Sequence, residues 1–234
     1  MTWNIHGAYG RNPRFDLQRV IALIERHRPD IVALQEIDSR RPREAGVVEP
    51  FAMLQSALGS HGVDAKSIAT KDGEYGQALI SRWPIESLEI HDISYQEREP
   101  RRAITGVVVT PYGPLRVIAT HLGLSIGERR DQTRALLRLI GDTGLPTVVM
   151  GDFNDWFWVG SVRRALSSRM AARSRLPTFP SYWPLFRFDR IYCSAQVPML
   201  NARTDREAWA LSDHLPVIAD VSLSVHPTPG AAAI

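Results

Sequence analysis

Apolar residues recur along the chain with two different spacings, and one of them is helical. One set follows an Asn12-Pro13 start signal and repeats every three to four residues, as one face of a helix does. A second set follows Ser125-Ile-Gly-Glu128, which fits a capping box. The sequence therefore predicts two helices, whose apolar residues are Leu17, Val20, Ile21 and Ile24 in the first and Leu136, Leu139 and Ile140 in the second.

The other spacing consists of short apolar runs, many of them rich in β-branched residues, which is typical of strands. Residues 111–114, Pro-Tyr-Gly-Pro, join two of these runs and predict a hairpin. Strands outnumber helices, so a regular alternation of strand and helix is excluded, and two sheets with outer helices are expected. The predicted strands are 31–34, 77–80, 104–109, 115–119, 147–150 and 217–221, preceded by a short piece at 1–5.

Length and composition indicate a single globular domain. The chain has 234 residues, 44% of them hydrophobic, so we expect one domain over 1–224 and a disordered tail over 225–234. One cysteine, Cys193, favours a reducing compartment. We see neither a signal peptide nor an apolar run long enough for a transmembrane segment, and we expect a cytoplasmic protein with no obligate protein partner.

The charge is modest but consists mostly of arginine. The net charge is +3, and 26 of the 28 basic residues are arginine, because only Lys66 and Lys71 are lysine. Arginine binds phosphate with a rigid fork, although genomic codon bias explains the excess equally simply. The mixed charges do not require a nucleic acid as the ligand.

Polar side chains follow several predicted strands at the point where each strand ends. In Val148-Val-Met-Gly-Asp152-Phe-Asn154, alternation along an extended chain directs the carboxylate and the amide to the same side. Taken singly, each residue fits a turn, a cap or a satisfied core position. If these strand ends share one rim, they form one site, made of Asn4, Glu36, His121, Asp152, Asn154, Asp189, Asp213 and His214.

The motifs that carry these residues occur in one order: TWNIHG, DIVALQE, YGQALISRWPI, THL, GDFN, FDRIY and SDH. Over about residues 1–222 the chain resembles the endonuclease/exonuclease/phosphatase superfamily, the fold group of DNase I. Its motifs are most similar to those of small bacterial members without an assigned substrate. The resemblance implies a four-layer α/β/β/α sandwich, with two mostly antiparallel sheets packed face to face and helices outside.

The resemblance also implies a site for Mg²⁺ or Mn²⁺. Glu36 matches the principal metal ligand of the family, Asn4 the asparagine beside metal and phosphate, and Asp213 a second metal contact. Carboxylate and amide oxygens suit such a hard cation, whereas zinc would favour clustered histidines or cysteines.

Five further residues match catalytic positions of the family. Asp152 corresponds to the acid that orients or deprotonates the attacking water, and Asn154 to a donor to the phosphate. His214 matches a histidine at the scissile phosphate, acting either as base or as electrostatic stabiliser, and Asp189 matches the acid that orients it. His121 matches the histidine that assists the leaving group in the DNase I and sphingomyelinase branches.

Substrate contacts are expected from residues outside this set. Tyr75, Gln77 and Arg102, and with them Arg101 and Arg129, are either phosphate contacts or ordinary solvated side chains. The aromatic run 156–158, which begins with Trp156, would dock an acyl chain or stack on a base, or pack locally in the core.

Together these features predict a divalent-metal-dependent hydrolase of phosphate esters. We expect a phosphodiesterase that acts by in-line attack of water on phosphorus, on a lipid headgroup, an inositol phosphate or a nucleic acid. A nuclease, including an abasic-site endonuclease, and a non-catalytic phosphate-binding scaffold remain alternatives. The acids in the motifs favour an enzyme over a non-catalytic scaffold, since burying an acid without a partner costs free energy.

Overall fold

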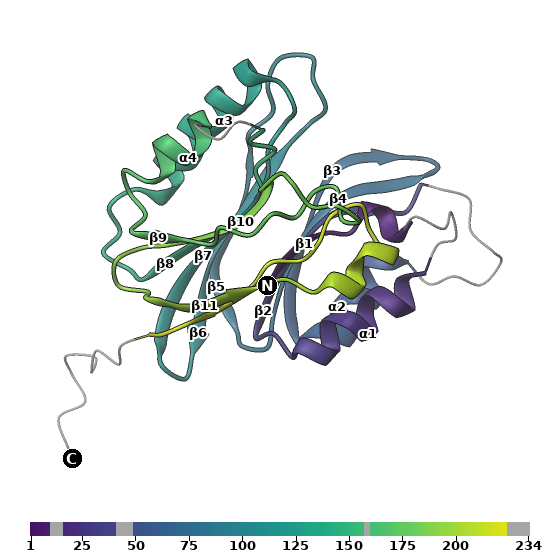
Figure 1. The fold of residues 1–234 in the computed structure, drawn as a ribbon, viewed down its shortest axis with the longest axis horizontal. Coiled ribbons are helices and arrows are strands. Elements are labelled where there is room, and N and C mark those ends of the chain that lie inside the picture. Colours follow the sequence, from purple (N-terminus) through teal and green to yellow (C-terminus); the bar gives the residue numbers. More distant parts are fainter. Residues whose placement is uncertain (10–15, 41–48, 157–159, 224–234) are drawn as a thin grey trace.

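Two sheets packed face to face form the centre of the molecule, with helices on both outer sides (Figure 1). The computed structural model describes residues 1–9, 16–40, 49–156 and 160–223. The expected helix start at 12–13, the predicted tail 225–234 and residues 157–158 of the aromatic run lie outside these described residues. None of the helices in these ranges has the length and apolar character needed to cross a membrane.

The first sheet has the strand order β1-β2-β4-β3. Strand β1 runs parallel to β2, and β4 is antiparallel to both of its neighbours. The predicted strand at 31–34 continues four residues further than expected, because a register shift between Leu34 and Ile37 lets it go on pairing. The strands are β1 (Thr2–Asn4), β2 (Ile31–Asp38), β3 (His61–Thr70) and β4 (Gly73–Ser81).

The second sheet has the order β5-β6-β7-β8-β10-β9. The turn at 111–114 joins β6 to β7 as predicted, with Thr110 opposite Gly113. The parallel pair β7 and β8 brings His121 opposite Asp152, and the antiparallel pair β8 and β10 brings Asp189 opposite Asp152. The strands are β5 (Ile85–Asp92), β6 (Arg102–Thr110), β7 (Gly113–His121), β8 (Thr147–Asp152), β9 (Ala172–Arg173) and β10 (Asp189–Cys193).

Both predicted helices are present, and each begins at a capping side chain. Asp16 accepts a hydrogen bond from the Arg19 amide at the start of the first helix, and Ser125 forms the expected capping box with Glu128 at the start of the other. The helices are α1 (Leu17–His27), α2 (Pro50–Leu58), α3 (Ile126–Ile140) and α4 (Ser161–Leu166), with 3₁₀ turns η1 (His6–Ala8) and η2 (Arg206–Ala210).

Three apolar clusters divide the described structure into four layers. Branched and small residues such as Val117 and Ala119 fill the space between the sheets. Helices α1 and α2 pack on the outer face of the first sheet around Trp3 and Phe51, and α3 and α4 cover the second sheet around Phe153. Alternation along each strand supplies both faces with apolar residues, which is why each sheet is buried on both sides. The predicted four-layer sandwich is confirmed.

The beginning and the end of the described chain meet between the sheets. Thr2 forms an isolated antiparallel bridge with Val217, so the predicted strand at 217–221 divides at this point. Its remainder, β12 (Ile218–Val221), pairs with β11 (Met199–Arg203). Trp3 donates from Nε1 to the carbonyl oxygen of His214 at 2.9 Å, which holds the final loop against the first strand.

Candidate active site

Asn4 lies at the centre of the gathered strand ends and connects two carboxylates. Its Nδ2 donates to Oε1 of Glu36 at 2.8 Å and to Oδ2 of Asp152 at 3.0 Å. Its Oδ1 accepts a hydrogen bond from the His6 amide at 3.1 Å, which fixes the orientation of the side chain. The amide is buried, so both of its N–H groups are used on acids from two different sheets.

Glu36 occupies the irregular position in β2. Its φ is +57°, in the region that few residues other than glycine adopt, and the register shift turns its side chain to the rim. Burial would raise the pKa of this carboxyl. The hydrogen bonds from His6 and Asn4 and the neighbouring histidines outweigh burial and hold the pKa well below its usual range. The carboxylate is therefore anionic at neutral pH.

His6 is a site residue that the sequence analysis did not assign. Its Nδ1 lies 3.4 Å from Oε2 of Glu36 and 3.6 Å from Oδ1 of Asp213. Strand β1 ends at Asn4, and His6 enters the site through the 3₁₀ turn that follows, so strand alternation gives no signal for this residue. Asp213 is 44% exposed at its side chain, so this corner of the site opens to solvent.

His214 and Asp189 form a buried pair. Nδ1 of the imidazole lies 2.8 Å from Oδ2 of the carboxylate, and both side chains are almost completely buried. Burial would lower the pKa of His214. The negative charges of Asp189 and Asp152 and the hydrogen bond to Asp189 raise it to about 10. The imidazole is therefore a cation at neutral pH, with its proton on Nδ1 held by Asp189.

Gly151 explains why β8 ends in Gly-Asp-Phe-Asn. Its φ is +152°, and a Cβ atom there would lie 1.9 Å from the carbonyl oxygen of Thr120. Only glycine lets β8 approach β7 this closely. Asp152 follows with its carboxylate buried, and Oδ1 accepts a hydrogen bond from the amide of Asn154 at 2.9 Å. The tight strand end thus places the acid on the rim.

The pKa of Asp152 is raised to about 6. Burial is the main cause, and the negative charge of Asp189 adds to it, while the charge of His214 and the hydrogen bond from Asn4 act in the opposite direction. Nδ1 of His214 lies 3.8 Å from Oδ2 of Asp152. A carboxylate with this pKa is ionised at neutral pH and accepts a proton more readily than an ordinary aspartate.

Arg101 determines the protonation state of His121. Its Nη1 lies 2.8 Å from Nδ1 of the imidazole, and a guanidinium group can only donate, so Nδ1 is the acceptor. Burial and the charge of Arg101 lower the pKa of His121 well below its usual value. The neutral ring therefore carries its proton on Nε2, which lies 3.6 Å from Oδ2 of Asp152.

Asn154 adds an amide beside this histidine. Its φ is +48°, and Nδ2 donates to the carbonyl oxygen of Leu122 at 2.9 Å. The same nitrogen lies 3.4 Å from Nε2 of His121. The backbone carbonyl of Leu122 thus accepts one of the two side-chain N–H groups of Asn154, and this hydrogen bond fixes the orientation of the side chain.

Tyr75, Gln77, Arg101 and Arg102 line one small pocket next to His121. Burial and the charge of Glu36 raise the pKa of Tyr75, so its phenol stays protonated. Nε2 of Gln77 donates to the Arg102 carbonyl at 2.6 Å, and its buried Oε1 has no hydrogen-bond partner among the described residues. Arg102 pairs with Asp92 at 2.6 Å.

Trp156 belongs to an aromatic cluster beside His214. Its ring centroid lies 4.6 Å from that of Phe188, and Phe188 lies 6.0 Å from the ring of His214. Trp156 is 39% exposed, so it packs on the cluster with one face and meets solvent with the other. Arg129, by contrast, is buried and donates to the carbonyl oxygen of Leu124, which gives it a structural position away from a ligand.

The protein is a sandwich of two sheets with acids, amides and histidines clustered at one end. Comparison with known proteins identifies its family. Residues 1–214 match the model of the Endonuclease/Exonuclease/phosphatase family. The chain belongs to this family, whose members are typically hydrolases of phosphate esters. It is 32% identical to the uncharacterized protein YbhP of Escherichia coli strain K12, with 95% of each chain covered.

Solved structures agree on the fold. An endonuclease/exonuclease/phosphatase from Beutenbergia cavernae is similar with a TM-score of 0.78 and 21% identity, over 95% of this chain and 70% of that one. A mannosyl-6-phosphatase from Bacteroides thetaiotaomicron is similar with a TM-score of 0.71 and 17% identity, over 95% of this chain and 98% of that one. The DNase I-like architecture expected from the motifs is confirmed.

Proposed function

We propose that the protein is a divalent-metal-dependent phosphodiesterase that uses water to cleave a phosphate ester. The observation that carries this proposal is the bridge from Asn4 to Glu36 and Asp152, with the His214–Asp189 pair beside it. Five separate segments supply these side chains. A scaffold that only binds phosphate has no need for three buried or partly buried acids clustered in one site, because their mutual repulsion is costly.

Glu36 and Asp213 would hold the metal, with Asn4 beside them. Both carboxylates face the same ring nitrogen of His6, at 3.4 and 3.6 Å, so their oxygens border one small region that is open to solvent. Anionic oxygen donors of this kind suit Mg²⁺ or Mn²⁺. When bound, such an ion would neutralise negative charge on the phosphate.

A second group of possible ligands is less suitable. Asp152, Asp189 and His214 each offer an atom, and these atoms lie within 4.8 Å of one another. The His214 atom in the group is engaged with Asp189, and the imidazole is protonated at neutral pH. A protonated imidazole cannot ligate a metal, so we assign this group to catalysis.

The side chains divide the remaining work of hydrolysis. Asp152 accepts a proton from the attacking water, since its pKa of about 6 lies near the operating pH. His214 is a fixed cation and stabilises charge that builds on the phosphate oxygens, which favours the role of stabiliser over that of base. His121 donates a hydrogen bond from Nε2 toward the leaving group, while Asn154 is placed to donate to the phosphate.

A chromogenic ester tests the proposal. Wild type, Asp152→Asn and the control Asp131→Asn, which changes an exposed residue of α3, would be assayed on bis-p-nitrophenyl phosphate and p-nitrophenyl phosphate with Mg²⁺, Mn²⁺ or EDTA. We expect metal-dependent release, faster with the diester, and a loss of about a hundredfold or more in Asp152→Asn alone. If no p-nitrophenol were released under any condition, the result would contradict the proposed enzymatic function and favour a non-catalytic phosphate-binding scaffold.

A further inference from the structure

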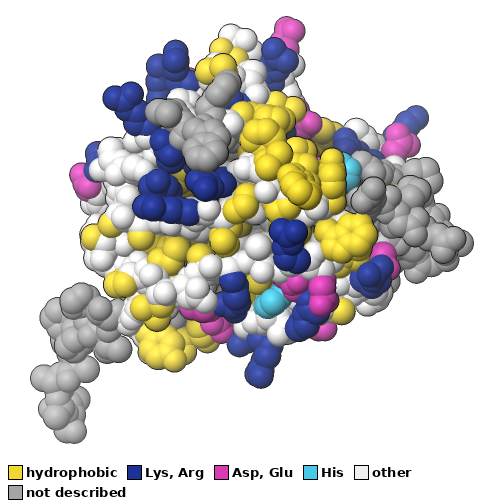
Figure 2. Space-filling view, in the orientation of Figure 1, with side chains coloured by type: hydrophobic (Ala, Val, Ile, Leu, Met, Phe, Trp, Pro, Cys, Tyr) yellow, Lys and Arg dark blue, Asp and Glu magenta, His cyan; other side chains and the backbone are white. Residues whose placement is uncertain are grey.

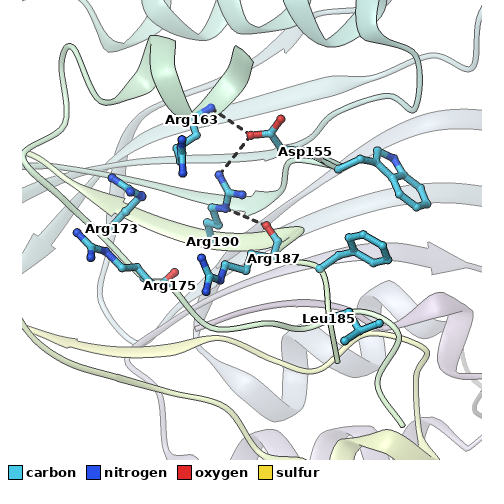
Figure 3. A pocket seen from close by; sticks show the side chains of 10 residues that line it. Asp155, Arg163, Arg173, Arg175, Leu185, Arg187 and Arg190 are labelled. Carbon is cyan, nitrogen blue, oxygen red and sulfur yellow. Dashed lines mark hydrogen bonds and ion pairs between the residues drawn. The ribbon is translucent and has the colours of Figure 1, made fainter. Parts of the chain in front are cut away.

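A pocket lined by arginines borders the aromatic cluster at Trp156, on the side away from His214. Figure 3 shows their side chains grouped around Arg190, with Asp155 at one side of the group and Leu185 at the edge. They come from four different parts of the chain, namely α4, the β9 strand and the residues after it, the loop before β10, and β10 itself. The arginines are Arg163, Arg173, Arg175, Arg187 and Arg190, and Asp155 lines the pocket with them.

Asp155 is the one carboxylate among the residues that line this pocket. It is buried, and its Oδ2 lies 3.4 Å from Nη1 of Arg190 and accepts a hydrogen bond from the Arg163 amide at 3.2 Å. Nε of Arg190 also donates to the Arg187 carbonyl at 2.8 Å. Asp155 therefore fixes Arg190 as the floor of the pocket, and it supplies the one negative charge among the described residues that line the pocket.

The remaining arginines leave the pocket electropositive. Burial lowers the pKa of Arg173, and the charges of Arg175, Arg163 and Arg190 lower it further. Nη1 of Arg173 lies 3.4 Å from the Ser167 hydroxyl, a neutral partner that supplies no charge. Like charges held together in a concave surface attract an anion, and guanidinium groups match the oxygens of phosphate in pairs.

The pocket and the catalytic residues share one wall. Asp155 and Trp156 directly follow Asn154, and Arg190 directly follows Asp189. Alternation along β10 directs Asp189 to the catalytic rim and Arg190 to the opposite side. Trp156 lines the pocket, and the rings of Phe188 and Phe179 lie between it and His214, with centroid distances of 4.6 and 6.0 Å through Phe188.

We propose that this arginine pocket binds a phosphate group of the substrate other than the one that is hydrolysed. The proposal rests on the proposed function and specifies its substrate class, an ester that carries at least two phosphate groups. Trp156 would lie between the two phosphates and contact the apolar or ring portion that joins them. The arginines would contribute to substrate binding. They would therefore raise the affinity for substrates that carry the second phosphate and leave the proton transfer by Asp152 unchanged.

The second phosphate has two possible sources, a free phosphorylated molecule or the headgroup of a lipid. Leu185 lines the pocket, and the segment just before it exposes two more large apolar side chains, Tyr182 and Trp183. Figure 2 shows hydrophobic side chains gathered on this face of the molecule with basic side chains beside them. Apolar rims of this kind insert into the interfacial region of a bilayer, so the test includes a lipid arm.

Binding of inorganic pyrophosphate in EDTA tests the pocket without catalysis. Calorimetric titrations would compare wild type, Arg173→Gln/Arg175→Gln and the control Arg134→Gln/Arg138→Gln on α3, all as the full chain. We expect the pocket variant to bind at least about tenfold more weakly than wild type and the control variant to bind within about twofold. Equal affinity of the pocket variant and wild type, with native circular dichroism for both, would overturn the proposal.

Activity separates this proposal from the proposed function. With glycerophosphoinositol and its 4-phosphate as a pair, we expect the pocket variant to raise KM only for the phosphorylated member. Retention on phosphatidylcholine vesicles that contain phosphatidic acid, lost in the same variant, would indicate a lipid source, and its absence a free one. If no ester is cleaved but pyrophosphate binding depends on the arginines, the proposed function fails and the anion site stands. An unchanged KM for both members would overturn the substrate role.

Discussion

Arg101 and His121 lie 2.8 Å apart, with the guanidinium group donating to Nδ1 of the imidazole. A cation that donates to one ring nitrogen prevents the ring from accepting a second proton there. The histidine is therefore a neutral hydrogen-bond donor through Nε2 at every pH near neutrality, and its protonated form is excluded as a general acid. Arg101 acts through the histidine as a positioning residue.

Replacing Arg101 with methionine is expected to raise the pKa of His121 toward its ordinary value. The substitution keeps the length of the side chain and removes both the donor and the positive charge that lowers this pKa. Titration of the His121 ring by NMR would measure the change. Arg102→Met is the control, because Arg102 pairs with Asp92 and leaves Nδ1 of His121 untouched. A ring that titrates identically in all three proteins would contradict the assignment.

Asp189→Asn is expected to move the alkaline limit of activity to lower pH. The carboxylate is the main group that raises the pKa of His214 to about 10, and without its charge the imidazole loses its proton nearer to neutrality. The pH profile of kcat/KM would show this shift together with a loss of activity. A loss that is uniform across pH would instead indicate a structural role for Asp189.

The same pair makes stability depend on pH. Because the pKa of His214 is raised on folding, its contribution to stability is complete below the unfolded value of about 6.5 and is lost as pH rises through about 10. We expect the denaturant midpoint of wild type to fall between pH 8 and pH 11 by more than that of His214→Gln. Parallel decreases in both proteins would assign the loss to other groups.

Asp152 is expected to cost stability at neutral pH. Its pKa is raised to about 6 from an ordinary value near 3.8, so the folded state disfavours the ionised carboxyl above pH 6. The penalty develops as pH rises from about 4 to about 6 and is absent below that range. Asp152→Asn should therefore compare more favourably with wild type at pH 8 than at pH 4 in urea unfolding. If the difference in unfolding free energy between Asp152→Asn and wild type did not change with pH, the result would contradict this prediction.

Glu36→Gln is expected to weaken Mg²⁺ binding by at least about tenfold, since a neutral amide replaces an anionic oxygen ligand. Calorimetry on the metal alone would measure it, with Glu86→Gln on the exposed side of β5 as control. Asp213→Asn should have a smaller effect, because this carboxylate is more exposed than Glu36. Unchanged Mg²⁺ affinity in Glu36→Gln would contradict the assignment of Glu36 as a metal ligand.

Strong periodicity and capping chemistry made much of the fold predictable. Helix α1 presents one apolar face, and helix α3 begins at a capping box that the sequence shows. Strands β6, β7 and β8 are mostly buried, so each contains a nearly continuous run of apolar residues. The elements that were not predicted include strands β3 and β5 and helix α2. The two strands lie at sheet edges with mixed exposure, and α2 is a short helix whose apolar residues form no clear stripe.

The structure brings residues of the ordered motifs together at one rim, whereas His6, although it lies in the TWNIHG motif, was not assigned a role from the sequence. His6 enters through the 3₁₀ turn after β1, and Glu36 through the bulge in β2, and neither irregularity has a signature in the pattern of apolar residues. The partner of His121 was equally hidden, because which arginine of the Arg101-Arg102 pair turns inward depends on the register of β6 against β7. Roles that depend on pairing across strands require the structure.

The first strand and the final loop are joined by Trp3, which donates to the His214 carbonyl, and by Ser212, which donates to the Asn4 carbonyl. Residues more than 200 positions apart thus complete each other. A ribosome must therefore release the chain from Trp3 through His214 before the proposed centre can assemble, so a shorter nascent chain lacks it. Synthesis of the loop around His214 thus sets the earliest moment at which the proposed activity can begin.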